Sequence, residues 1–411
     1  MNVRHLLRLL LVGILIFTLP SCTVKQEKEQ PDDNTPTQTL LFYFVGTDLD
    51  RYSHLRNNRA AIKAALNYNI QGNSRVLIFH QDGSKKQGDI VEMKYKDGLC
   101  DEKVLTTVTL PEEMNDIELG KIFSQMMEYA PADSYSLIIG SHGTGWIPIG
   151  AQPGGSVSAW GSKHILTHEE MWQRDENPIT RFLGDGNTNL ENSFDTTTLS
   201  SAIASTGVKL EYILFDACFM ANVESLYDLR YNAKHIIAST CEIMGAGFPY
   251  RKILPFMLKN NGTSYDLKSI CEAFYLDYKD DETYPSGAVA LIDCSQLDAL
   301  AKAMKTVNSA AHKDYDLADI QSYERQANHI FFDLGDYVDA MCDDSEAKEA
   351  FKSQLDKCIV VKYAPEKFYS AYPANNRGIC DITSFCGMNT SAPSVLYRDT
   401  YVETAWHKAT N

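Results

Sequence analysis

Between residues 39 and 250, short apolar runs alternate with segments of helical pattern. The apolar runs have the length of buried strands and lie at 39–46, 75–81, 135–143, 210–218 and 234–240. Segments with apolar residues at helical spacing lie between them, at 53–67, 116–130, 196–206 and 221–230. Nearly continuous apolar strands separated by helices predict a parallel sheet covered on both faces. The segments DIVEMKY and KVLTTVTL predict an antiparallel hairpin beside it.

After Tyr250 the pattern becomes mostly helical, at 266–279 and 296–312, with one further strand predicted at 287–294. The tail regains strand character in CIVVKY and RGICDITSFCG and ends in a helical segment, TYVETAWHKAT. We therefore predict one large α/β domain over 39–411, with a core to about residue 255 and a helical C-terminal part. Residues 144–190 are polar, glycine-rich and without periodicity, which in a compact domain indicates a functional or mobile loop.

The N-terminus has the pattern of an export signal. A basic start is followed by the apolar run 9–17 and then by Leu19-Pro20-Ser21-Cys22. The apolar run is too short to span a membrane, as is typical of a secretory signal. The ending at Cys22 resembles a bacterial lipobox, so residues 1–21 would be removed and Cys22 would carry lipid. The alternative is a plain signal peptide with an incidental cysteine. Residues 23–38 are almost devoid of aliphatic side chains and predict a flexible tether, so we expect an exported, membrane-anchored lipoprotein.

Composition narrows the class of protein further. Hydrophobic residues make up 44% of the chain, enough for a sizeable core, and the net charge of −16 excludes an ordinary nucleic-acid binder. A monomer is expected. Of the ten cysteines, most lie in apolar segments and are expected to be free and buried, while a Cys380–Cys386 disulfide is left open.

Two predicted strands end in residues that carry chemistry. Ser141-His142-Gly143 follows one apolar run, and Asp216-Ala217-Cys218 follows another. The carboxyl ends of parallel strands gather at one edge of a sheet, so these groups can meet there. An imidazole beside a thiol favours the nucleophilic thiolate. The N–H groups of Gly143 and Cys218 are the candidates for an oxyanion hole. Taken singly, a lone histidine or cysteine is more often a packed residue.

The segments SHGTGW and FDACFMANVES resemble the two catalytic blocks of the clostripain family of cysteine peptidases, related to caspases, gingipains and legumain. Further matches in the same order are LLFYFVGTDLD, IIASTCEIMGAGFPY, FFDLGDYVDAM, RGICDITSF and 401–406. The resemblance implies a caspase-like α/β/α sandwich with a mostly parallel central sheet. It also implies an endopeptidase in which Cys218 forms the acyl-enzyme and His142 is the general acid and base.

The resemblance also implies cleavage of protein or peptide substrates after Arg or Lys. Asp216 matches the family's acidic pocket position, where a carboxylate would pair with the basic side chain. The second wall of the pocket would come from 238–250, with Glu242, Ser239 and Thr240 as substrate-binding candidates. This segment is less polar than in better-known members, which leaves open an altered specificity.

Family members are often zymogens that cut themselves after the histidine block, and the basic candidates here are Lys163, Arg174 and Arg181. The chemistry needs no cofactor, although the resemblance implies calcium. No calcium or other metal site is assigned, because Asp185, Asp195 and Asp333 are scattered and no EF-hand spacing occurs.

Three alternatives accompany this interpretation. The chain could instead be a catalytically silent binding lipoprotein on the same fold, or a thiol amidase, or a transpeptidase; the last two share nucleophile and base with a peptidase.

His164 and His168 lack the glutamate of a zinc motif, so a solvated loop is expected there. Trp146 either lines the cleft or supports packing.

Overall fold

The computed structural model describes residues 37–81, 83, 86–149, 180, 193–259, 264–312, 314–372 and 376–411. Pro36–Asn411 form one compact unit. Several predicted features lie outside the described residues: Cys22 with its signal and the tether as far as residue 36, the basic residues Lys163, Arg174 and Arg181, and also His164, His168 and Asp185. The predicted tether ends one residue too late, because Gln38 is buried in the first strand. Within the described ranges, no helix is both long and apolar enough to cross a membrane.

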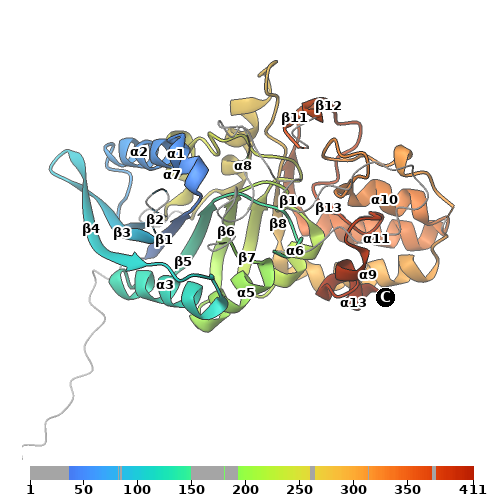
Figure 1. Cartoon of the computed structure of the whole chain (residues 1–411), viewed down its shortest axis with the longest axis horizontal. Coiled ribbons are helices and arrows are strands. Elements are labelled where there is room, and N and C mark those ends of the chain that lie inside the picture. The colour runs from blue at the N-terminus through green and yellow to red at the C-terminus, as the bar shows by residue number, and fades with distance from the viewer. Residues whose placement is uncertain are drawn as a thin grey trace, which may run out of the picture. The chain divides into compact units, whose positions relative to one another are not determined.

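A nine-stranded sheet forms the centre of the fold (Figure 1). Its strands in spatial order are β10 (Ile359–Tyr363), β8 (Val289–Asp293), β7 (Ala233–Ala238), β6 (Leu210–Asp216), β5 (Tyr135–Gly140), β1 (Gln38–Phe44), β2 (Ser74–Gln81), β3 (Gln87–Lys96) and β4 (Leu99–Thr109). The five central strands, from β7 to β2, run parallel, as their continuous apolar runs predict. The predicted hairpin is β3–β4, and it extends the sheet antiparallel to β2.

Helices cover both faces of this sheet. One face carries α1 (Thr47–Arg51), α2 (His54–Leu66), α7 (Tyr250–Met257) and α8 (Leu267–Tyr278), and the other carries α3 (Asp116–Tyr129), α5 (Thr196–Ser205) and α6 (Val223–Leu229) (Figure 1). Two separate apolar clusters fill the layers, because alternate residues of each buried strand point to opposite faces. The predicted α/β/α sandwich is therefore confirmed.

The C-terminal part is mostly helical, as the sequence predicts. The strand predicted at 287–294 and the strand character predicted for CIVVKY are present as β8 and β10. The helices of this part are α9 (Leu297–Ser309), α10 (Leu334–Met341), α11 (Ser345–Cys358), α12 (Arg398–Tyr401) and α13 (Ala405–Thr410). It also adds β8 and β10 antiparallel to the main sheet, and it forms two small sheets, β11 (Lys367–Ser370) with β12 (Gly378–Asp381) and β9 (Phe332–Asp333) with β13 (Asn389–Thr390). Helix α11 was not predicted, although its buried residues Ala347, Phe351, Leu355 and Cys358 recur at helical spacing.

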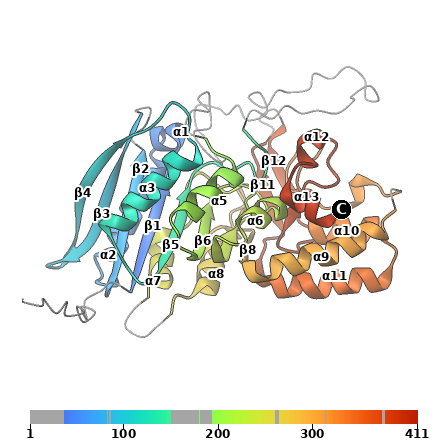
Figure 2. The same cartoon turned by 90° about the horizontal axis from the view of Figure 1, so that it is seen from below.

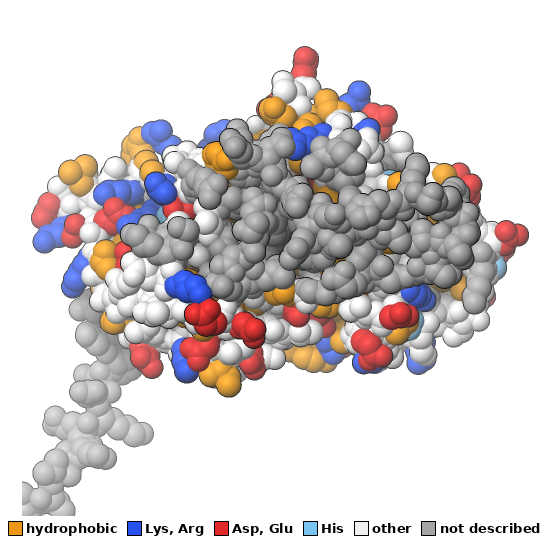
Figure 3. Space-filling view, in the orientation of Figure 1, with side chains coloured by type: hydrophobic (Ala, Val, Ile, Leu, Met, Phe, Trp, Pro, Cys, Tyr) orange, Lys and Arg blue, Asp and Glu red, His pale blue; other side chains and the backbone are white. Residues whose placement is uncertain are grey.

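Elements of the C-terminal part lie at the carboxyl edge of the parallel strands. Figure 2 shows α1, which follows β1, at the same edge as β11, β12 and α12. Acidic and basic side chains are interspersed around the rim of the face in Figure 3, so the net negative charge is not gathered in one patch there. All nine cysteines of the described residues are free thiols, Cys380 and Cys386 included.

Candidate active site

The predicted histidine and cysteine follow two neighbouring parallel strands, β5 and β6. Gly140 pairs in register with Asp216, and the Ser141 N–H donates to the Asp216 carbonyl at 3.3 Å. His142 and Cys218 each come two residues after this pair. Both strands end earlier than the apolar runs predict, at Gly140 and Asp216, because the chain leaves the sheet before the reactive residues. The two side chains thus start from matching positions on one edge.

Gly143 brings the histidine loop against the cysteine backbone. A Cβ on Gly143 would lie 2.4 Å from the carbonyl oxygen and 2.9 Å from the amide nitrogen of Cys218. A Cβ at that distance would push the two loops apart, so their observed approach requires glycine at this position. The sequence singled out Gly143 for its accessible N–H, and the structure adds this close backbone approach.

The Cys218 sulfur is held in a defined position. Cys218 and His142 both have 0% exposure, so neither side chain is open to solvent. The Ile243 N–H donates to the sulfur at 3.3 Å, and the Ile243 carbonyl lies 3.7 Å from it. A backbone N–H directed at sulfur favours the thiolate, whereas the carbonyl accepts from the neutral thiol. The loop after β7 therefore contacts the sulfur in either protonation state.

A tight turn follows the cysteine. Phe219 has φ +60°, a left-handed conformation that costs a residue with a Cβ roughly 1–2 kcal/mol. The Phe219 N–H donates to the Cys241 carbonyl at 3.0 Å, and the Ala221 N–H donates to the Ser239 carbonyl at 2.8 Å. Helix α6 then begins, with Asn222 as its N-cap. The loop after β7 thus supports the turn that presents Cys218.

Asp216 is buried at the end of β6. Its Oδ2 accepts from the Tyr250 hydroxyl at 2.8 Å, and its Oδ1 accepts from the Phe248 N–H at 3.2 Å. These donors fix the carboxylate plane and place it against the segment 238–250, which the resemblance gives as the second pocket wall. The structure brings the two predicted parts of the pocket into contact.

The other three pocket candidates lie in the loop after β7, and two of them, Glu242 and Thr240, contact the C-terminal part. The Glu242 Oε1 accepts from the Ser370 hydroxyl at 2.8 Å and from the Tyr372 N–H at 3.0 Å. Ser239 accepts from the Cys241 N–H through its hydroxyl oxygen at 3.1 Å. The Thr240 carbonyl accepts from Asn389 at 2.8 Å. These contacts hold the loop to the C-terminal part of the fold.

Sequence reasoning missed Asn389, which joins three segments around the site. Its side chain donates to the Thr240 carbonyl and accepts from the Asn222 side chain at 2.7 Å, while its N–H donates to the Ala221 carbonyl at 2.9 Å. A single asparagine in the tail gives no local signal, since its partners lie 149 and 167 residues away.

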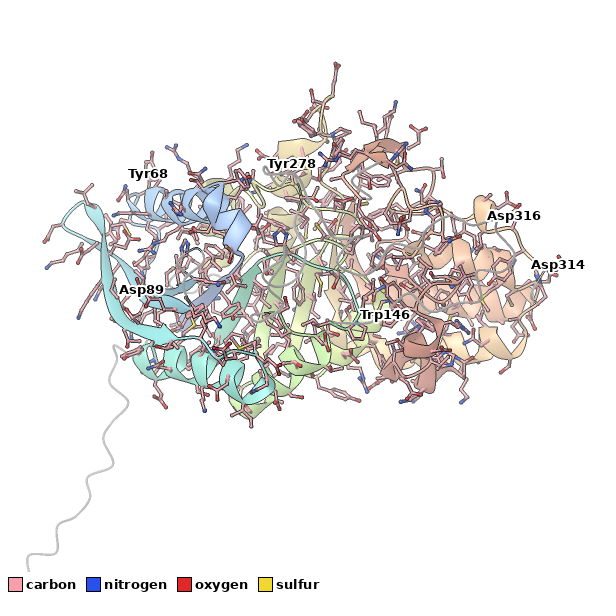
Figure 4. The ribbon with its side chains drawn as sticks, viewed as in Figure 1. Tyr68, Asp89, Trp146, Tyr278, Asp314 and Asp316 are labelled. Carbon is pink, nitrogen blue, oxygen red and sulfur yellow. The ribbon has the colours of Figure 1, made fainter. Side chains whose placement is uncertain are left out.

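Trp146, four residues after His142, is 4% exposed. Its ring makes an edge contact with Tyr401 at 5.3 Å, where the central sheet meets the C-terminal elements (Figure 4). In this structure Trp146 supports packing.

No group of three or more His, Cys, Asp or Glu side chains comes together among the described residues to hold a metal. Asp333 instead accepts from Tyr323, Cys386 and Asp336, and Asp195 accepts from the Ile149 N–H.

Comparisons with known proteins bear on the fold and the family of this chain. A model of the clostripain family matches residues 164–411. A secreted C11 cysteine protease from Bacteroides thetaiotaomicron, "iotapain", is 31% identical with a TM-score of 0.78, covering 92% of this chain and 99% of that one. A second secreted C11 cysteine protease from that organism, solved with an irreversible peptide inhibitor, is 22% identical with a TM-score of 0.72, covering 91% and 99%, and supports the fold alone.

A clostripain from Bacteroides thetaiotaomicron, in complex with the peptide inhibitor BTN-VLTK-AOMK, is 35% identical with a TM-score of 0.50. It covers 55% of this chain and 98% of that one. The search of curated proteins found no match. The family match and the structural likeness to iotapain show that this chain belongs to the clostripain family and is a cysteine peptidase.

Proposed function

We propose that this protein is an endopeptidase that cleaves after Lys or Arg, with Cys218 as nucleophile and His142 as general acid and base. The observation that carries the proposal is the matched position of the two residues. Each comes two residues after the register pair Gly140–Asp216, and Gly143 lies against the Cys218 backbone.

The reaction needs one proton carrier and one nucleophile. His142 takes the proton of the Cys218 thiol, and the thiolate attacks the scissile carbonyl carbon. The N–H groups of Gly143 and Cys218 donate to the resulting oxyanion. Its collapse breaks the C–N bond while the His142 imidazolium protonates the leaving amine, and a thioester remains. A water molecule, deprotonated by His142, then attacks the thioester, and Cys218 regains its proton.

Asp216 gives the proposal its preference for a basic residue. The carboxylate is buried beside the segment 248–250, and a buried charge pairs strongly with a guanidinium or ammonium group. The inhibitor bound to the related clostripain has the letters VLTK, which end in lysine. Glu242 accepts from Ser370 and Tyr372, and Asp216 likewise accepts from Phe248 and Tyr250. The choice of Asp216 therefore rests on its match to the acidic pocket position of the family.

The burial of both reactive side chains fits a latent form of the enzyme. A substrate carbonyl reaches the Cys218 sulfur only after a rearrangement. Self-cleavage after Lys163, Arg174 or Arg181 stays a prediction for that step. Identical fragments from purified wild type and Cys218→Ala would exclude it.

Export and anchoring through Cys22 complete the proposal. The support is the lipobox-like ending at Cys22, together with the 31% identical secreted protease. Calcium dependence is proposed from the family resemblance alone, and loss of activity in the presence of a chelator tests it.

The proposal is tested with fluorogenic peptides that carry Lys, Arg, Asp, Asn or an apolar residue before the scissile bond. We expect hydrolysis of the Lys and Arg peptides by wild type and none by Cys218→Ala. Activity that survives in Cys218→Ala would overturn the mechanism. Cleavage only after apolar residues would overturn the role of Asp216 and leave the dyad intact. Amide transfer to an added amine in place of hydrolysis would favour a transpeptidase.

A further inference from the structure

One aromatic ring from the C-terminal part contacts both loops of the candidate active site. Phe331 is fully buried, and its ring stacks on that of Phe219 with centroids 4.3 Å apart and an interplanar angle of 11°. Phe219 directly follows Cys218 and has the left-handed backbone described above. A Cβ on Gly145, three residues after His142, would lie 2.9 Å from the edge of the Phe331 ring.

A buried carboxylate fixes the segment that carries this ring. Glu324 has a side chain with 0% exposure, and its Oε1 accepts from the N–H groups of Ile330 at 2.6 Å and Phe331 at 3.4 Å. Its Oε2 accepts from the Gln326 N–H at 2.6 Å and meets His329 Nδ1 at 3.2 Å. Residues 324–331 therefore close around one carboxylate, and Phe331 leaves this loop in a fixed direction.

The other side of Phe331 is also fixed. The Tyr323 N–H donates to the Phe331 carbonyl at 2.9 Å, and Phe332 begins strand β9, which pairs with β13. Strand β13 carries Asn389, which already binds the segments on both sides of the candidate pocket. The ring is thus built into a rigid frame, whereas Phe219 and Gly145 are both at positive φ in turns.

We propose that Phe331 is a positioning residue for the Cys218–His142 dyad, because its ring sets the spacing of the turn after the cysteine and the loop after the histidine. This inference rests on the proposed function, since it assumes that the two residues react together. A left-handed Phe219 persists only where its surroundings hold it, and the stacked ring of Phe331 supplies that support. With a smaller side chain at 331, the turn relaxes and the sulfur moves relative to the imidazole.

The test compares Phe331→Leu with a matched control, Phe79→Leu. Phe79 is also fully buried, stacks on Tyr43 at 5.1 Å and 11°, and lies against a glycine, since a Cβ on Gly88 would be 2.4 Å from its ring. Phe79 is in β2, two strands away from β5. Both variants lose similar stacking and packing, so their melting temperatures should fall by similar amounts.

Two readouts separate positioning from stability. One is kcat and KM on the Lys peptide. The other is the pH dependence of iodoacetamide alkylation at Cys218, followed by mass spectrometry of the peptide that contains it. Both are measured well below the melting temperatures, on the full chain incubated until the activity of wild type on the Lys peptide is constant, because Cys218 is buried in the latent form. For Phe331→Leu we expect kcat to fall by about 10- to 100-fold, KM to stay within about twofold, and alkylation to need a higher pH than in wild type. Phe79→Leu should keep the wild-type values of all three.

A wild-type kcat and alkylation profile in folded Phe331→Leu would overturn the proposal, and so would an equal loss of kcat in Phe79→Leu. If Phe331→Leu does not fold, Glu324→Gln replaces it, because that variant keeps the ring and weakens its anchor. It should change the alkylation profile in the same direction, and an unchanged profile refutes the proposal. Failure of the proposed function is seen separately, as peptide hydrolysis that persists in Cys218→Ala.

Discussion

Replacing Gly143 by alanine tests the geometry of the candidate site directly. The new Cβ would lie 2.4 Å from the Cys218 carbonyl oxygen and 3.0 Å from the Ala217 Cβ, whereas ordinary contact begins near 3.4 Å. The variant must therefore separate the two strand-end loops by about 1 Å. Misplacement of that size can lower an enzymatic rate about 100-fold. Overpacking of this kind destabilises a fold by roughly 1–3 kcal/mol.

We therefore expect Gly143→Ala to fold, with a lower melting temperature, and to have a kcat about 100-fold below wild type. The assay is steady-state hydrolysis of the Lys peptide, together with thermal unfolding of the same samples. Gly207→Ala is the control, because Gly207 has φ +71° but nothing lies within 4 Å of its added Cβ. It precedes β6, away from the carboxyl edge, and should lose stability while keeping kcat. A folded Gly143→Ala with wild-type kcat would refute the reasoning.

Three further predictions follow from the described contacts and the N-terminal motif. Asp216→Asn keeps a similar shape but removes the charge, so kcat/KM for Lys and Arg peptides should fall by about 10- to 100-fold, since a charged hydrogen bond contributes about 1.5–3 kcal/mol. An equal loss on a norleucine peptide would contradict this. Burial raises the pKa of Glu224 to about 7, although hydrogen bonds from Thr390 and Ser391 act in the opposite direction and lower it. A raised folded-state pKa gives stability that is present below the ordinary value of 4.5 and is lost as pH rises through about 7. The melting temperature should therefore fall over that pH range in wild type and vary less in Glu224→Gln. Parallel pH profiles of the two proteins would exclude this role. Finally, Cys22→Ser should abolish metabolic labelling with an alkynyl fatty acid, and labelling that persists would exclude lipidation at Cys22.

Local pattern was sufficient for the elements of the parallel sheet. Strands β1, β2, β5, β6 and β7 and helices α2, α3 and α5 all lie within a few residues of the predicted ranges. Buried strands need apolar side chains on both faces, and amphipathic helices need an apolar stripe, so both leave a signal in consecutive residues. The ends of β5 and β6 were less well predicted, because the residues after them are buried for a reason other than strand pairing.

In the candidate site, too, some features could be predicted from local sequence and others could not. The positions of His142 and Cys218 at strand ends could be predicted, since each follows its own apolar run. The contact between Gly143 and the Cys218 backbone could not, because it depends on how two strands 76 residues apart in the chain are registered. The contact of Glu242 with Ser370 could not be predicted for a similar reason, since Ser370 lies 128 residues further on.

The sequence by itself therefore determined the order of strands and helices, the two reactive side chains and the family resemblance that joins them. Only the tertiary structure decided how the C-terminal part frames the site, with Phe331 stacked on Phe219 and Asn389 joining Asn222 to Thr240. The physical reason is that periodicity records the burial of each residue but not the partner against which it is buried. That partner is fixed by packing and hydrogen bonding between segments more than a hundred residues apart in the chain.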